Sequence, residues 1–139
     1  MAELLGIAAS AAGLLGVAAQ LAELTYKYVG SIREAQDTIG SYIQELATLT
    51  SAVLRLKNAS NVQSVHHLLG DDRDEGAIIK ALEDCKREVG QLKDKLEKRS
   101  RGKLAPLTWP FSESEVKKKV QMLQRYNTIF SSVLVADNL

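Results

Sequence analysis

The spacing of the apolar residues is the feature that most constrains this chain. Between residues 31 and 57, apolar side chains recur at alternating intervals of three and four, with charged residues elsewhere. The stretch from 76 to 99 repeats this spacing, and the stretch from 113 to 136 follows it less regularly. Such intervals place side chains on one face of an α-helix, so each stretch is predicted to form an amphipathic helix. The expected core positions are Ile32, Ala35, Ile39, Tyr42, Leu46, Leu49, Val53, Leu56, Ile78, Leu82, Cys85, Val89, Leu92, Leu96, Val116, Val120, Leu123, Tyr126, Asn127, Phe130 and Leu134.

The composition of the 139-residue chain favours helices over strands. It has only 2 Pro and 5% aromatic residues, and its many Ala, Leu, Glu, Lys and Gln residues lose little rotamer freedom in a helix. We therefore expect an all-α fold, an antiparallel bundle of about four long helices. The helices are predicted at roughly 4–29, 31–57, 76–99 and 113–136, within a single domain over residues 1–139. Ser112 and Glu115 have the spacing of a capping box at the start of the last helix.

The first predicted helix carries no charge from Leu4 to Ala22, a run of 19 residues. At a rise of about 1.5 Å per residue the run spans about 28 Å, close to the ~30 Å hydrocarbon core of a bilayer. The acidic Glu3 precedes it and the first basic residue is Lys27, so the run lacks the positive start of a secretory signal. Insertion would be marginal, because the strongly apolar residues contribute only ~0.3 to 0.6 kcal/mol each. These residues are Leu4, Leu5, Ile7, Leu14, Leu15, Val17 and Leu21.

A marginal helix of this kind supports two interpretations. It is a permanent core helix of a soluble bundle, or it leaves the bundle for a membrane when something shifts an equilibrium of a few kcal/mol. In the second case Glu3 is a polar tip that has to cross the bilayer or line a pore. Small residues four apart suit close helix packing in lipid, but they suit tight contacts in a soluble bundle equally well. The pairs with this spacing are Gly6/Ser10, Ala9/Gly13 and Ala12/Gly16.

Positive charge gathers where the third and fourth predicted helices meet. Between residues 98 and 119 there are seven basic residues and two acidic ones, and Trp109 and Phe111 lie in the same segment. Basic side chains next to aromatic rings suit anionic lipid headgroups, at about 1 kcal/mol per basic residue. Alternatively, the two rings fold back as a hydrophobic plug and the basic residues are only solvated. The predicted headgroup contacts are Lys98, Arg99, Arg101, Lys103, Trp109, Lys117, Lys118 and Lys119.

Signatures of catalysis and of cofactor binding are missing from the sequence, so we expect no enzyme, no cofactor and no metal site. No phosphate-binding glycine loop, dinucleotide-binding turn or nucleophile elbow occurs. His66 and His67 are adjacent and point apart on a helix, and the acidic run 71–75 departs from a calcium-binding loop at Gly76. Cys85 occupies a core position, and a single cysteine allows no internal disulfide, which favours a reducing compartment. The near-neutral charge of +1 argues against nucleic acid as a partner.

Segments from the beginning, middle and end of the chain carry a family likeness. They are Leu5-Gly6-Ile7-Ala8-Ala9-Ser10, then Leu82-Glu83-Asp84-Cys85-Lys86-Arg87-Glu88-Val89, then Leu107-Thr108-Trp109-Pro110-Phe111 with Glu115-Val116 and the later Ile129-Phe130 to Asp137. Together they resemble the fungal HeLo-like domain over nearly the whole chain, and the Trp-Pro-Phe segment is the most specific part. This family is an N-terminal module of fungal NOD-like receptors, related to the HeLo domain and to the helical bundles of mixed-lineage kinase-like and plant resistance proteins.

The resemblance implies a cell-death execution domain with a HeLo-like four-helix bundle. Such a domain oligomerises when its receptor is triggered, delivers its first helix to the plasma membrane and permeabilises it. The implied partners are anionic membrane lipids, further copies of the domain and an upstream trigger domain, and the implied location changes from cytoplasm to plasma membrane. Because NTPase, repeat and amyloid-forming segments are missing from the sequence, an interpretation as a fragment of a longer receptor stays open. The rival hypothesis is a soluble interaction and oligomerisation module without membrane activity.

Overall fold

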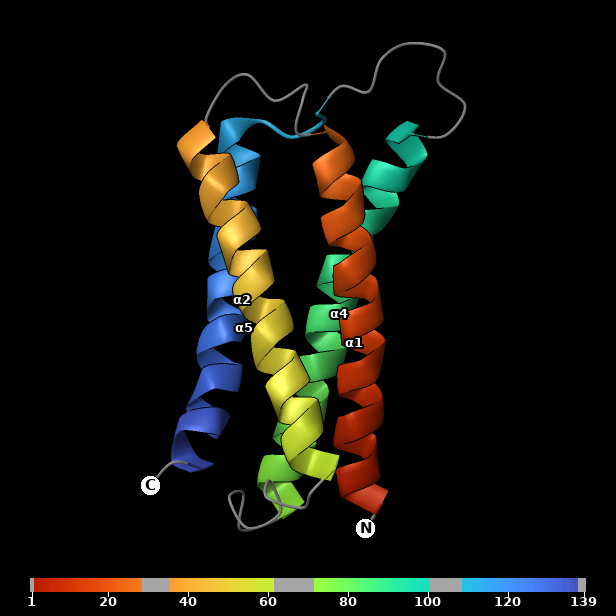
Figure 1. Cartoon of the computed structure of the whole chain (residues 1–139), viewed down its shortest axis with the longest axis vertical. Helices are drawn as coiled ribbons and strands as arrows, with labels where there is room; N and C mark the ends of the chain where they lie inside the picture. Colours follow the sequence, from red (N-terminus) through yellow and green to blue (C-terminus); the bar gives the residue numbers. More distant parts are fainter. Residues whose placement is uncertain (1, 29–35, 62–71, 101–108, 138–139) are drawn as a thin grey trace.

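The fold consists of helices throughout the part of the chain that the structure describes. A computed structural model describes residues 2–28, 36–61, 72–100 and 109–137. Their helices are α1 (Ala2–Tyr28), α2 (Gln36–Asn61), α4 (Asp72–Ser100) and α5 (Glu113–Asp137), and no strand occurs among the described residues (Figure 1). Each helix contributes an apolar face to a shared interior. The all-α bundle expected from the sequence is confirmed.

The helices run alternately up and down, so consecutive helices are antiparallel, as predicted (Figure 1). They do not stand around the bundle in chain order. α1 packs closely on α2 and on α4, and α5 packs closely on α2, whereas α4 and α5 approach each other far less closely. The neighbours α1 and α4 are parallel, because hydrogen bonds join Ser10 to Glu83 near their starts and Tyr28 to Leu96 near their ends. The α1–α2 seam therefore lies on the side of the bundle opposite the α4–α5 seam.

The interior is built from the periodic stripes that the sequence predicted. Every predicted core position among the described residues is buried, while Ile32 and Ala35 lie outside them. α1 adds a stripe of its own at intervals of seven residues. Its members are Ile7, Leu14, Leu21 and Tyr28, each 0% exposed. Since burying one large apolar side chain contributes about 1.5–3 kcal/mol, this shared core is what holds the helices together.

Two helix boundaries lie four residues outside the predicted ones. α2 continues past Lys57 to Asn61, and α4 begins at Asp72 instead of residue 76. The predicted range 76–99 left the acidic run 71–75 outside the helix, and this boundary was wrong: from Asp72 onward the run forms the first turn of α4. The helix dipole explains the difference, because negative charge is stabilising within the first turn and not only before it.

The start of α5 has the predicted capping box. The Ser112 N–H donates to Glu115 Oε1 and the Glu115 N–H donates to Ser112 Oγ, both at 3.2 Å. The Val116 N–H donates to the Ser112 carbonyl oxygen at 3.0 Å, which begins the helical ladder. The backbone donor of Ser112, followed by its side chain, lowers the pKa of Glu115. The cap fixes where the helix begins and so how the preceding Trp109-Pro110-Phe111 segment approaches the bundle.

Candidate functional site

α1 contributes its large apolar side chains to the bundle interior. The fully buried members of the predicted inserting set are Ile7, Leu14 and Leu21. Two others, Leu15 and Val17, are partly buried and pack against the core. The remaining members have side chains outside the described residues, and they are Glu3, Leu4 and Leu5. Every residue of this set whose side chain the structure describes therefore packs against the bundle core.

One group of small residues in α1 faces α4. A Cβ added at Gly6 would lie 3.0 Å from Ile79 Cδ1, and one added at Gly13 would lie 3.2 Å from Lys86 Nζ. Ser10, between these glycines, donates a hydrogen bond to a carboxylate of α4 at 2.8 Å. These close contacts join α1 to α4 within the bundle, and they account for this group without reference to lipid.

A second group of small residues in α1 faces solvent. Its members are Ala9, Ala12, Gly16 and Ala19. A Cβ added at Gly16 would meet nothing within 4 Å, so this face is open. α1 has no charged residue between residues 6 and 22, whereas α4 carries Lys, Arg, Asp and Glu densely along its length. Over this stretch the exposed side chains of α1 are uncharged, and apart from Gln20 they are small.

By length and composition, the 23-residue segment Gly6–Tyr28 of α1 could cross a membrane. The core helix of a soluble protein passes the same test. Burial of the large side chains fits the core role, but the bundle does not require an uncharged outer face. The candidate functional element is therefore a helix with one apolar face packed in the bundle and an uncharged outer face.

Trp109 closes the end of the bundle where α1 and α4 finish and α5 starts. Its ring makes edge-to-face contacts with Tyr28, Tyr42 and Phe111 at centroid distances of 5.9, 6.1 and 5.2 Å. The Trp109 Nε1 is buried and has no hydrogen-bond partner within the described part of the chain. Phe111 is buried as well, with Lys95 Nζ 4.7 Å from its ring centroid. This is the folded-back plug, the alternative to headgroup contact for these two rings.

The hydroxyl groups of the two tyrosines beneath the plug are paired. The Tyr28 hydroxyl donates to the Leu96 carbonyl oxygen at 2.8 Å, and the Tyr42 hydroxyl lies 3.1 Å from Thr25 Oγ1. Burial raises the pKa of Tyr42 to about 12, against a smaller lowering by the hydrogen bond with Thr25. These bonds tie the end of α1 to α4 and to α2.

The basic residues near the plug divide into two groups. Lys98 and Lys117 are exposed, and Lys117 pairs with Glu113 at 3.7 Å. Lys118 and Lys119 line a groove between α4 and α5. The other predicted headgroup contacts lie outside the described side chains, and they are Arg99, Arg101 and Lys103.

No group of His, Cys, Asp and Glu side chains that could hold a metal ion occurs among the described residues. His66 and His67 lie outside them. Cys85 is buried, and burial, followed by the nearby charge of Glu88, raises the pKa of its thiol to about 12. Because only the thiolate is a strong nucleophile, this cysteine has the core role predicted for it.

Sequence reasoning missed the α4–α5 groove and a polar contact within the α2–α5 seam. Asn127 is 6% exposed, and its Nδ2 donates to the Glu45 carbonyl oxygen at 3.1 Å and to Glu45 Oε1 at 2.8 Å. An Asn within an apolar stripe is the signal that pointed to such a contact. The groove has no comparable signal, because it arises from the separation of two helices.

Comparisons with protein-family models, with curated proteins and with solved structures gave no match to this chain. The likeness to HeLo-like domains therefore stays a prediction from the sequence. The function has to follow from the geometry of α1, the plug and the groove.

Proposed function

We propose that the chain is a membrane-permeabilising effector domain whose first helix transfers from the bundle to a membrane when copies of the domain assemble. The closed bundle rests in the cytoplasm, and the assembled form acts at the plasma membrane, as in the cell-death role that the HeLo-like resemblance implies. Its partners are anionic lipids, further copies of the domain and an upstream trigger domain. The mechanism involves no enzymatic step and no cofactor.

One observation carries the proposal: α1 has no charged side chain on any face between residues 6 and 22, although one of its faces is exposed. A surface helix of a soluble bundle ordinarily has charged and polar residues on its outer face, as α4 does. An uncharged outer face is suited to contact with lipid or with another helix. The small side chains on this face let helices approach closely in lipid.

The free energy of the transfer depends mainly on the surfaces of α2 and α4 that are uncovered when α1 leaves the bundle. The α1 side chains have apolar surroundings in the bundle and in the bilayer, so they contribute little to the difference between the two states. The apolar stripes of α2 and α4 lose their cover, at about 1.5–3 kcal/mol for each large side chain. The hydrogen bonds from Ser10 and Tyr28 to α4 are also lost, at about 0.5–1.5 kcal/mol each. A single domain therefore retains α1, and its release requires an assembly that covers these stripes again.

The test of the proposal places one charge on the outer face of α1. Gly16 lies near the middle of Gly6–Tyr28, is exposed and has open space around its Cβ position, so the bundle accommodates Gly16→Lys. At the bilayer centre a lysine costs about 2.5–3.5 kcal/mol. The protein is concentrated on anionic vesicles through a C-terminal His tag and a nickel-chelating lipid. We expect dye leakage from Gly16→Lys to fall about 100-fold, at 1.4 kcal/mol per factor of ten.

Two matched variants separate the charge from effects on folding. Gly16→Ala makes a similar gain in helix propensity without a charge, and it should leak as the unmodified chain does. Gly40→Lys adds the same charge at an exposed glycine of α2 that also has open space around it, and it should leak normally. Equal leakage from Gly16→Lys and the unmodified chain would overturn the proposal.

A chemical cross-link tests the release of α1 from α4. Ser10 and Glu83 are hydrogen-bonded across these helices, so a short bismaleimide joining Ser10→Cys to Glu83→Cys should hold α1 in the bundle. Leakage should stop after cross-linking and should persist when Ser10→Cys and Glu83→Cys, each alone beside the buried native Cys85, are treated alike. Leakage that continues from cross-linked protein would contradict the transfer of α1.

The rival hypothesis, a soluble interaction module without membrane activity, predicts different results. In that case the unmodified chain does not release dye at any surface density on anionic or neutral vesicles. Self-association in solution, measured by analytical ultracentrifugation, would instead depend on the outer face of α1 and be lost in Gly16→Lys.

A further inference from the structure

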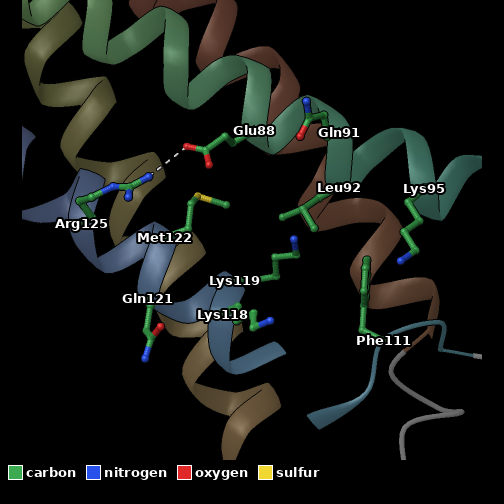
Figure 2. Close-up of a pocket in the computed structure, with 10 residues that line it drawn as sticks. All are labelled: Glu88, Gln91, Leu92, Lys95, Phe111, Lys118, Lys119, Gln121, Met122 and Arg125. Carbon is green, nitrogen blue, oxygen red and sulfur yellow. Dashed lines mark hydrogen bonds and ion pairs between the residues drawn. The ribbon is translucent and has the colours of Figure 1, made fainter. Parts of the chain in front are cut away.

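A groove of about 430 Å³ lies between α4 and α5, the neighbouring helices that approach each other least closely. Leu92 extends from α4 and Met122 from α5 into the space between the helices, and Phe111 lies at one end (Figure 2). Leu92 and Phe111 are buried and Met122 is partly buried against the core. The groove therefore has a small apolar floor that continues into the bundle interior, and its other lining side chains are polar or charged.

Two ion pairs between α4 and α5 mark the extent of the groove. Arg125 pairs with Glu88 at 3.3 Å, and Lys95 pairs with Glu115 at 3.4 Å. The Arg125–Glu88 pair is visible across the gap between the helices (Figure 2). Along α4 the distance from Glu88 to Lys95 corresponds to about 10 Å at 1.5 Å per residue, or about two helical turns. An occupant of this length is a short helix and not a single side chain.

The residues that line the groove carry more positive than negative charge. Lys118 and Lys119 line it from α5, and neither has an ion pair with a carboxylate in the part of the chain that the structure describes. The neighbouring cations differ: Lys95, Lys117 and Arg125 all have carboxylate partners. A ligand with carboxylates that reach Lys118 and Lys119 and apolar side chains that contact the floor complements the groove in both charge and polarity.

The position of the groove favours a protein occupant over a lipid surface. The α4–α5 seam lies on the side of the bundle opposite the α1–α2 seam, which includes the uncharged outer face of α1. If that face meets the membrane, the groove faces away from it. An apolar floor with a charged rim is also the form of site in which amphipathic helices bind.

We propose that the α4–α5 groove binds an acidic amphipathic helix of a partner protein. Apolar side chains on one face of this helix rest on Leu92 and Met122, and flanking Asp or Glu residues pair with Lys118 and Lys119. The choice of a protein over a lipid surface rests on the proposed function, whereas the binding itself takes place on the bundle in solution and is measured without a membrane.

Nuclear magnetic resonance on the intact ¹⁵N-labelled chain tests this binding. The probes are three synthetic peptides of equal length: an amphipathic helix with Leu on one face and Glu beside it, the same peptide with Lys in place of Glu, and the first peptide with its order scrambled. The Glu peptide should bind saturably and shift the amide signals of residues 88–95 and 118–125. The Lys peptide and the scrambled peptide should bind at least tenfold more weakly.

Charge reversal identifies the residues responsible. Lys118→Glu/Lys119→Glu should weaken binding of the Glu peptide at least tenfold. The matched control is Arg55→Glu/Lys80→Glu, which makes the same change in net charge at exposed positions that do not line the groove, and it should change the affinity less than threefold. Lys118 is exposed, so Lys118→Glu alone gives a variant whose fold is not at risk, with an intermediate loss.

Other outcomes overturn the proposal. Equal weakening by the two double variants would mean that the peptide follows net charge and not the groove. Shifts confined to α1 and α2, or no saturable binding, would exclude the groove as a helix site. If phosphatidylcholine vesicles with phosphatidylserine bound the chain through Lys118 and Lys119 while the peptide did not, the two lysines would belong to a lipid contact.

Discussion

Replacing Trp109 with alanine should lower the free energy of unfolding by about 3 kcal/mol. A buried Trp→Ala change costs about 3–5 kcal/mol, and Trp109 is only partly buried, so the lower end applies. The contacts give the same order, since edge-to-face pairs contribute about 0.5–1.5 kcal/mol each and Trp109 makes them with Tyr28, Tyr42 and Phe111. Trp109→Ala thus removes the plug and leaves a hollow between three other aromatic rings.

Trp109→Phe should be far milder, within about 1 kcal/mol of the unmodified chain. Phenylalanine keeps an aromatic ring in the plug, although a smaller one. It also removes the buried Nε1 donor, which has no partner among the described residues and whose burial costs about 1–3 kcal/mol. The loss of ring area and the removal of this unpaired donor act in opposite directions.

Urea unfolding followed by far-ultraviolet circular dichroism measures both changes without relying on tryptophan fluorescence. Tyr26→Ala is the matched control, because this aromatic ring is 63% exposed and its removal should cost well under 1 kcal/mol. A cost below about 1 kcal/mol for Trp109→Ala would refute the plug, because no core aromatic is so easily removed. A loss in Trp109→Phe as large as in Trp109→Ala would show that Nε1 has a partner after all.

Leu49→Ala and Leu92→Ala should each cost about 2–5 kcal/mol in urea unfolding, since both side chains are buried, and a much smaller loss would contradict their core positions. Cys85, with a pKa of about 12, should react with a disulfide reagent at pH 8 only after urea is added, and fast reaction of the native chain would contradict its burial. The fold lowers the pKa of Glu115 below its ordinary value of 4.5, so the ionised carboxylate stabilises the folded chain at pH values above 4.5. This stabilisation is lost as the pH falls through the pKa that Glu115 has in the folded chain. The stability difference between the unmodified chain and Glu115→Ala should therefore shrink below pH 4.5 in acid titrations, and a difference independent of pH would contradict it.

The helices and their buried faces were predictable because both depend on local spacing. A side chain three or four residues from its neighbour lies on the same face of a helix whatever the helix packs against. The stripe containing Leu82, Cys85 and Val89 was therefore recognisable before any packing partner was known. The ends were less predictable: the dipole favours acidic residues both before and within the first turn, so the charges near Asp72 did not locate the start of α4.

The order of the helices around the bundle was not predictable in this way, because it depends on contacts between distant segments. In the parallel pair of α1 and α4, Gly6 lies against the side chain of Ile79 and Gly13 against that of Lys86. A sequence shows that a residue is small but not which helix takes the space. The position of Trp109 was open for a similar reason, since an indole ring suits a membrane interface and a hydrophobic plug equally well.

This order also determines what would remain of the bundle if α1 left it, as proposed above. α5 packs on α2 through the contact of Asn127 with Glu45, and α1 takes no part in that seam. The ion pairs between α4 and α5 do not involve α1 either. The plug is different, because Tyr28 at the end of α1 is one of three aromatic partners of Trp109, the single tryptophan of the chain. Tryptophan emission that changes on contact with anionic vesicles, while helix content stays constant, would therefore report the release of α1 and not general unfolding.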